Sequence, residues 1–408
     1  MHINNDAFNR IALYCLFGAV LTTFFDRAIV FNFRLNDVLV IISLLMSVLS
    51  LRFLFTGWAW LSFLVIPTII LSTSIYYFIT FNGDIDRLIF IYKYSLLGIV
   101  PLVVNQVVAT KKDCLILLRA SFILLVALSL WSILYAFLVF SGHLVGSIRP
   151  SFPFSDDFMY SDAHLYANVL VVLWAGYYLF GANVLQHQAL KRYLTTMAFL
   201  VGLILTGSRN GIVLLCLLML LNSVSWVIEM ARSKRIDSRS IFLSIFSFAV
   251  LLILFLLMDY LGYPILDFIS KLRVFDFGLA ADGSTLSRFY KIRIALSELD
   301  SFTRVIFGVG PVGSELLWYD NGAIALLVHS GLSGLVVFLI LLVKIASNVI
   351  DAGAGRYTFN FLTLILIYLI GNLVTEFYLV SRNFIPSAVL LSVFYRFIVL
   401  SRECEANK

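Results

Sequence analysis

Residues 193–229 read YLTTMAFLVGLILTGSRNGIVLLCLLMLLNSVSWVIE, which is two apolar runs on either side of the polar residues TGSRNG at 206–211. As one helix this segment would be about 55 Å long, although the hydrocarbon core of a bilayer is only about 30 Å thick. Lys191 and Arg192 precede it and Arg232 follows it, and such charges mark the cytoplasmic side. The sequence therefore predicts two membrane-spanning helices joined at 206–211, where Gly, Ser and Asn favour a tight turn.

The whole chain shares this apolar character. Of its 408 residues, 61% are hydrophobic and only 13% are charged, whereas soluble domains carry about 25% charged residues. The net charge of +6 does not indicate nucleic-acid binding, because the basic residues are scattered between apolar runs. The four cysteines show no metal-ligand spacing and no disulfide framework. We therefore expect an all-α polytopic membrane protein, and the residues show no motif for a metal or a cofactor.

Apolar runs of about 20 residues predict about 12 spans, within a range of about 10 to 13. The basic residues of the short loops then fall on one face together with both termini, and we expect that face to be cytoplasmic. We expect one membrane domain over residues 1–408. The expected spans are approximately 8–25, 37–55, 57–79, 88–108, 114–140, 163–184, 192–206, 211–229, 241–260, 320–346, 357–380 and 384–401.

Three segments share the opposite, periplasmic face in this arrangement. They are the loop 141–162, the turn around Arg209 and the long segment 261–319. The last is too polar to span a membrane and too apolar to be disordered. It contains an expected amphipathic helix from about Ser284 to Leu296, with Ser284 as its N-cap.

Arginines on this outer face are the first candidate functional residues. Arg209 lies between two apolar runs, and arginine near hydrocarbon depth is costly unless it has a partner or a function. A guanidinium group suits phosphate, so an anion site is one interpretation, and a lipid-headgroup anchor is the other. The same face could include a positive pocket that contains Arg288, Lys291 and Arg293, or these residues could form a solvated charged face. Both interpretations stay open, because segment 261–319 has six basic and six acidic residues and is not basic overall.

Other polar residues accompany the outer ends of the expected spans. Asp320 opens the tenth span, either as a general base or as a helix N-cap. His329 lies deeper in the same span, and we expect it to be a core histidine with its hydrogen bonds satisfied. His164 is a weaker candidate, at the start of the sixth span. Glu376 and Arg382 are expected to pair or to line the same cavity.

Several of these motifs resemble one known family, the O-antigen ligase and O-antigen polymerase superfamily. The residues LTGSRNG at 205–211 resemble its T-x-S/T-R hairpin turn. The order FGVG, DN and GLSGL resembles its F-G-x-G … H/D-N … x-G-x-x-G segment. Two further stretches are similar to its arginine-bearing periplasmic helix and to the residues before its sixth span. In the order named, these five segments are 307–310, 320–321, 331–335, 282–288 and 149–168.

The resemblance implies a C-type glycosyltransferase-like membrane fold in the bacterial inner membrane, with the active site facing the periplasm. The implied donor is an undecaprenyl-pyrophosphate-linked oligosaccharide. Arg209 and Arg288 match the arginines that hold the pyrophosphate. Asp320 stands where the ligase has a histidine, which favours the polymerase. We expect the remaining substrate-binding residues to be Arg149, Tyr160, His164, Lys291, Arg293, Asn321, Glu376 and Arg382.

The expected function is therefore an O-antigen, or related surface polysaccharide, polymerase that works by inverting glycosyl transfer. Its implied partners are the lipid-linked glycan, membrane lipid and a chain-length regulator protein, and no nucleic acid. Two alternatives stay open. One is a ligase that transfers glycan to a lipid A core. The other is a flippase or secondary transporter, although transporters often have two similar halves and the sequence shows no such similarity.

Overall fold

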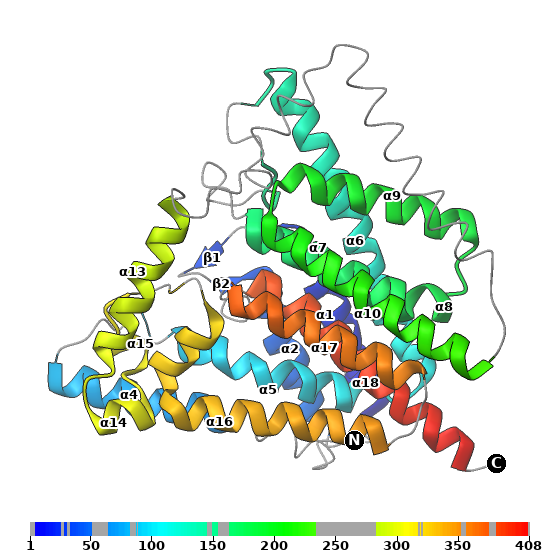
Figure 1. Cartoon of the computed structure of the whole chain (residues 1–408). Coiled ribbons are helices and arrows are strands. Elements are labelled where there is room, and N and C mark those ends of the chain that lie inside the picture. The colour runs from blue at the N-terminus through cyan, green and yellow to red at the C-terminus, as the bar shows by residue number, and fades with distance from the viewer. Residues whose placement is uncertain are drawn as a thin grey trace.

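A computed structural model of the chain describes residues 5–25, 28–30, 33–50, 64–81, 87, 89–144, 149–153, 163–233, 283–316, 319, 321–351, 356–374 and 381–406. These residues form a bundle of long helices with a group of short helices at one end (Figure 1). One small antiparallel pair of strands, β1 (Ala28–Val30) and β2 (Phe33–Arg34), follows the first helix.

The helical elements are bounded as follows. They are α1 (Asn5–Leu21), η1 (Thr22–Phe24), α2 (Leu35–Leu49), α4 (Val65–Phe81), α5 (Ile89–Val107), α6 (Lys111–Phe140), α7 (Ala163–Gly176), η4 (Tyr177–Gly181), α8 (Ala182–Val184), α9 (Ala189–Thr206), α10 (Arg209–Ser233), α13 (Gly283–Glu298), α14 (Phe302–Phe307), α15 (Gly310–Gly313), α16 (Gly322–Asp351), α17 (Arg356–Val374) and α18 (Ser381–Ala406).

The helices have the length and polarity of a multi-pass membrane protein. Seven helices of the described part are long and apolar enough to cross a bilayer, and four further apolar helices are shorter. Each expected span except 241–260 overlaps one of these helices, and 241–260 and parts of spans 37–55, 57–79 and 357–380 lie outside the described residues. The prediction of a helical membrane protein is therefore confirmed.

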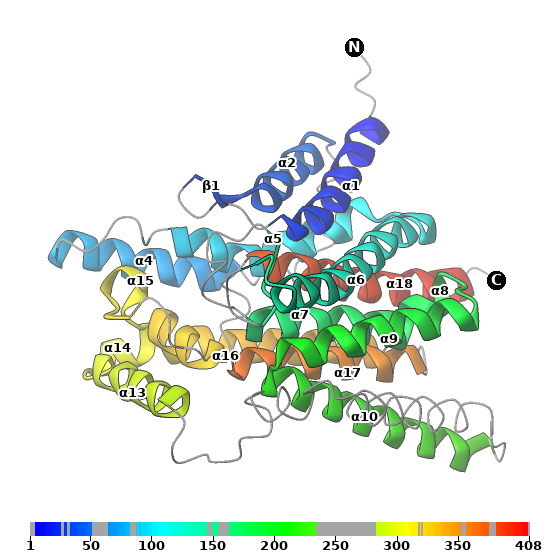
Figure 2. The same ribbon diagram turned by 90° about the horizontal axis from the view of Figure 1, so that it is seen from above.

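The bundle has two distinct ends. The chain enters α5, α16 and α18 at the end where α13, α14 and α15 lie, and it leaves them at the opposite end (Figure 1). The turn between α9 and α10 is also at the first end in both views (Figure 2). We call this the outer end, following the sequence-based orientation.

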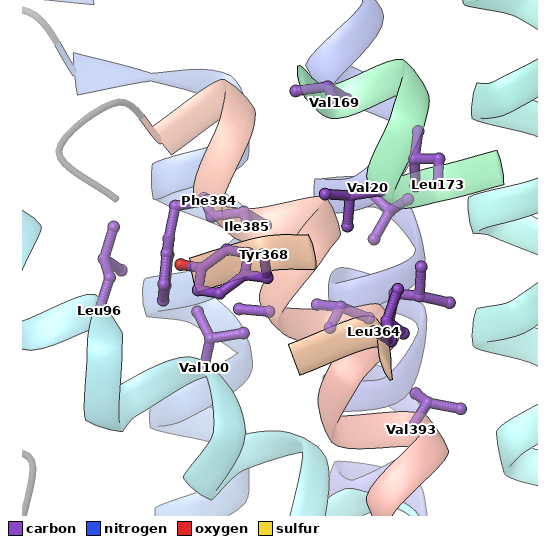
Figure 3. Packing of buried hydrophobic residues seen from close by; sticks show 14 of the residues in the cluster. Val20, Leu96, Val100, Val169, Leu173, Leu364, Tyr368, Phe384, Ile385 and Val393 are labelled. Atoms are coloured by element: carbon purple, nitrogen blue, oxygen red, sulfur yellow. The ribbon is translucent and has the colours of Figure 1, made fainter. Parts of the chain in front are cut away.

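The core is apolar throughout, and α18 contributes much of it. Side chains of α1, α5, α7, α17 and α18 interlock around Tyr368 and Phe384 (Figure 3). The ring of Phe180 stacks on that of Phe394 with 4.0 Å between centroids. Phe180 lies in η4, a wider π-helical turn that releases a backbone carbonyl. Asn360 of α17 donates a hydrogen bond of 2.7 Å to that carbonyl at Leu179, so the irregular turn is satisfied inside the bundle.

Two local expectations change in the structure. Helix α13 begins at Gly283, so Ser284 lies inside the helix and its assignment as the N-cap is wrong. Part of the expected loop 141–162 is packed rather than open. The indole nitrogen of Trp131 donates to the carbonyl of Ser151 at 2.8 Å, and the buried ring of Phe152 meets Tyr166 edge-on. Residues 149–153 therefore belong to the folded bundle.

Candidate functional site

The expected turn at 206–211 is confirmed, and its residue types have local structural reasons. Gly207 has a φ of +57°, the left-handed conformation that ends α9 and that glycine adopts without strain. The Thr206 hydroxyl accepts a hydrogen bond from the Ser208 N–H at 3.2 Å. The Ser208 hydroxyl accepts from the Gly211 N–H at 3.3 Å, as an N-cap does, so α10 begins at Arg209.

Helix α7 holds this turn in place. The buried amide of Asn210 donates to the side-chain oxygen of buried Asn168 at 2.7 Å. His164 Nδ1 lies 3.2 Å from the Ser208 hydroxyl, so one of its ring nitrogens is engaged within the protein. A Cβ added at Gly211 would lie 2.9 Å from the Cβ of Ala167, which makes glycine necessary at this contact. The start of α10 is therefore fixed rather than free to swing.

We expect Asn210→Ala to destabilise the protein by about 1–3 kcal/mol, because the buried Asn168 oxygen loses its donor. Asn222→Ala is the matched control on the same helix, since Asn222 makes only an exposed contact of 3.4 Å to Tyr178. The thermal unfolding midpoint of each purified variant in detergent measures the difference. Equal losses in the two variants would show that the Asn210 contact contributes nothing.

The two arginines expected to bind pyrophosphate lie on elements of the same end. Arg209 is the first residue of α10, and Arg288 lies in α13. The first turn of α10 and the whole of α13 are at the outer end of the bundle (Figures 1 and 2). The side chains of both arginines lie outside the described part of the structure, so their mutual distance stays a prediction.

The start of α16 is capped by Asn321. Its side-chain oxygen accepts the N–H groups of Ala323 and Ile324 at 3.0 and 3.1 Å. Asn321 therefore caps α16, its predicted contact with substrate stays a prediction, and the cap does not explain Asp320, the residue before it. Asp320 itself lies outside the described residues.

Helix α16 is broken at Gly331, which has the non-helical angles φ 66° and ψ −171°. Gly308, between α14 and α15, fits against this break. A Cβ added at Gly308 would lie 2.5 Å from the Val328 carbonyl oxygen, and one added at Gly331 would lie 2.3 Å from the Ile306 carbonyl. The Val309 N–H donates to the Val328 carbonyl at 2.8 Å. We call this backbone contact of Gly308 with Gly331 the glycine clamp. It gives a structural reason for one glycine in FGVG and one in GLSGL.

His329, next to the break, is buried among aromatic rings. Its Nδ1 lies 2.8 Å from the hydroxyl of Tyr94, and the rings of Phe90 and Tyr319 lie 6.2 and 6.0 Å from its own. Its Nε2 is buried and has no hydrogen-bond partner among the described residues. The burial of His329 confirms the expectation of a core histidine. The expectation that both ring nitrogens have hydrogen-bond partners is wrong.

A hydrogen-bonded carboxylate links α13 to the residues before α16. The Tyr319 hydroxyl donates to both oxygens of Glu298, at 2.8 and 3.0 Å, and the Glu315 N–H donates to one of them at 3.0 Å. Burial raises the pKa of Glu298. Sequence reasoning counted Glu298 only as one acid among six, since nothing in its neighbourhood along the chain distinguishes it.

A buried ion pair joins α2 to α5 near the outer end. Lys93 Nζ lies 3.1 Å from Asp37 Oδ2, with the side chains 7% and 0% exposed. The Arg34 N–H and the Tyr92 hydroxyl also contact the Asp37 carboxylate, at 3.0 and 3.3 Å. This pair was not among the residues expected from the sequence. The sequence did offer a signal: Asp37 and Lys93 are opposite charges in two expected spans, and charged residues in spans usually pair.

The other predicted site residues are placed as follows. Arg149 is half-buried in the packed residues 149–153, and on α13 Lys291 is half-buried while Arg293 is exposed. The backbone of Arg382 lies in the first turn of α18, and its side chain lies outside the described residues, as do Tyr160 and Glu376. Within the described ranges, no group of three or more His, Cys, Asp or Glu side chains could hold a metal ion.

Comparisons with known proteins add no assignment. No protein-family model matches the sequence, and no curated protein matches it significantly.

Proposed function

We propose that the chain is an O-antigen-type polysaccharide polymerase of the bacterial inner membrane, with a C-type glycosyltransferase-like fold of about 12 spans. It would join repeat units carried on undecaprenyl pyrophosphate at the periplasmic face. The observation that supports this most is the gathering at the outer end of the three motif-bearing elements, α10 at its first turn, α13, and α16 at its capped start (Figures 1 and 2).

The proposed reaction is an inverting glycosyl transfer without a metal. An acceptor sugar hydroxyl attacks C1 of the donor sugar, the C1–oxygen bond to the pyrophosphate breaks, and the lipid diphosphate leaves with the bonding electrons. Arg209 and Arg288 stabilise the charge that builds on the diphosphate. Asp320 accepts the proton of the attacking hydroxyl, as the base carboxylate of an inverting glycosidase does for water.

The local structure favours fixed positions for these groups. The Ser208 cap and the Asn210–Asn168 hydrogen bond fix the first turn of α10, which begins at Arg209. The Glu298–Tyr319 hydrogen bonds and the Asn321 cap hold the chain on both sides of Asp320. A charged residue on a rigidly held backbone needs to move little during the reaction. Such preorganisation is what electrostatic stabilisation of a transition state requires.

Ladder formation by the purified protein from lipid-linked repeat units tests this proposal. We expect Arg209→Ala and Asp320→Asn each to slow it by about 10²–10³-fold, the cost of losing one transition-state contact. Arg119→Ala is the control, since Arg119 is exposed on α6, away from the outer end. Full activity of Arg209→Ala would refute the pyrophosphate site, and full activity of Asp320→Asn would refute the base.

The same assay separates the polymerase from the ligase. A ladder of products without any lipid A core supports the polymerase. Product that forms only when the core acceptor is added would assign the chain as a ligase.

A flippase is the second candidate, because one observation favours it. Transporters often have helices broken within the membrane, and α16 is broken at Gly331. Movement of lipid-linked sugar across reconstituted vesicles, without any new glycosidic bond, would assign that function instead.

A further inference from the structure

Helices α14 and α15 lie deeper than a loop outside the membrane would. The glycine clamp places Gly308 beside Val328 and Gly331, and Gly331 follows the start of α16 at Gly322 by nine residues. Nine helical residues advance about 13 Å along a helix axis. The chain between α14 and α15 therefore contacts α16, a candidate membrane span, well inside its outer end.

Contacts with helix α4 also place this stretch of chain inside the outer end of the bundle. A Cβ added at Gly310 would lie 2.9 Å from the hydroxyls of Thr73 and Ser74, at the middle of α4. Ser74 precedes the outer end of α4 at Phe81 by seven residues, which is about 10 Å. Two independent contacts, one on each neighbouring helix, thus place the same short stretch at the same depth.

Residues 302–313 approach their deepest point and return from it on the same side, toward the outer end. Before the deep point, the Arg304 guanidinium lies over the Tyr77 ring, 5.7 Å from its centroid. After it, a Cβ added at Gly313 would again meet the Tyr77 ring, at 2.6 Å. Tyr77 lies one turn nearer the outer end of α4 than Ser74 does. Residues 302–313 therefore descend from the level of Tyr77 to that of Ser74 and return.

Helix α14 exposes large apolar side chains, which would be unfavourable in contact with water. Phe302, Phe307 and Val305 are 81%, 48% and 36% exposed, although they occupy one six-residue helix. The adjacent α4 also exposes large apolar side chains, among them Tyr76 and Ile79. Contiguous exposed apolar surface marks contact with a protein, a ligand or a membrane. Helix α14 packs on α16, a candidate membrane span, and α15 packs on α4, which is also apolar.

Several backbone groups of this stretch have hydrogen-bond partners, which an environment without water favours. The N–H groups of Gly308 and Ser314 donate to the Arg304 and Gly310 carbonyls at 2.7 and 3.1 Å. The Arg87 guanidinium donates to the carbonyls of Pro311 and Ser314. The charged pair Asp300–Arg304, with 3.0 Å between its nitrogen and oxygen atoms, lies at the start of this stretch, nearer the outer end. Its side chains reach solvent there.

We propose that residues 302–313 form a re-entrant segment that dips into the outer leaflet between α4 and α16. Phe302, Val305 and Phe307 contact the acyl chains of the surrounding bilayer. This assignment does not depend on the proposed enzymatic function. It replaces the expectation that the whole of segment 261–319 lies outside the membrane.

Site-directed spin labelling of the full chain tests the re-entrant segment. The four native cysteines are replaced, single cysteines are introduced at 302, 305 and 307, and the labelled protein is reconstituted in phosphatidylcholine vesicles. Accessibility to oxygen, which concentrates in lipid, is compared with accessibility to a water-soluble nickel chelate. Ile75 of α4 is the lipid-facing control, and the exposed residues His143 and Asp300 are the aqueous controls.

We expect the oxygen-to-nickel ratio at 307 to match that at 75 and to exceed that at 143 and 300 severalfold. The ratio at 302 should lie between those of 307 and 300, because Phe302 is nearer the rim. Nickel accessibility at 302 and 307 equal to that at 300 would overturn the proposal in favour of a water-exposed loop. Low accessibility to both reagents would overturn it in favour of a protein contact. The label at 305 decides the outcome if one of the other variants does not fold.

Discussion

Gly308→Ala and Gly331→Ala are each expected to destabilise the protein by about 2–5 kcal/mol. Either methyl group would enter the glycine clamp, where a Cβ lies 2.3 to 2.5 Å from backbone atoms of the opposite segment. Backbone cannot rotate away as a side chain can, so one helix must move, and overpacking of this kind costs about 1–3 kcal/mol. The two glycines also have φ values of 76° and 66°, which add about 1–2 kcal/mol for alanine.

Gly142→Ala separates these two contributions. Gly142 has a φ of +75° but no atom within 4 Å of an added Cβ, so this variant carries the backbone strain without the collision. We expect it to lose only about 1–2 kcal/mol. Tryptophan-monitored thermal unfolding in detergent, together with the monodisperse fraction in gel filtration, ranks the three variants. If Gly308→Ala were no less stable than Gly142→Ala, the close approach of Gly308 to α16 would be wrong.

The glycine clamp also marks where sequence reasoning succeeds and where it stops. The positions of the apolar helices were predictable because a bilayer dictates the length and the polarity of every crossing segment. The turn at 206–211 was predictable for the same reason, since one helix over 193–229 would be too long. The break at Gly331 gave no such signal, because the apolar run continues on both sides of it. Only the approach of Gly308, distant along the chain, shows why the helix must break there.

Pairing between helices was beyond the sequence for a related reason. In a soluble helix the buried face is the apolar one, whereas lipid-facing and buried faces of a membrane helix are both apolar. Hydropathy therefore did not show that Tyr94 contacts His329 or that Glu298 contacts Tyr319. It did not show that residues 302–313 return into the bundle either, because a short polar-flanked stretch looks like an external loop.

Asp37→Asn is expected to cost about 3–5 kcal/mol, because it leaves the Lys93 ammonium buried without its carboxylate. Asp300→Asn makes the identical chemical change in the exposed Asp300–Arg304 pair, which has a similar N–O distance of 3.0 Å. That control should cost less than about 1 kcal/mol, since water and salt screen an exposed pair. The comparison therefore reports mainly on burial, because the mutated residue and the N–O distance are nearly the same in the two pairs.

The double variant Asp37→Asn/Lys93→Met decides whether charge or packing is responsible. Methionine fills much of the lysine volume without a charge, so removing both charges should recover most of the stability lost in Asp37→Asn. The introduced asparagine would still offer an oxygen to the Arg34 N–H and the Tyr92 hydroxyl, which keeps those contacts comparable. The same thermal unfolding assay applies. A double variant as unstable as the single one would mean that the loss comes from packing of α2 on α5, and an unaffected single variant would mean that the pair is not buried in the folded protein.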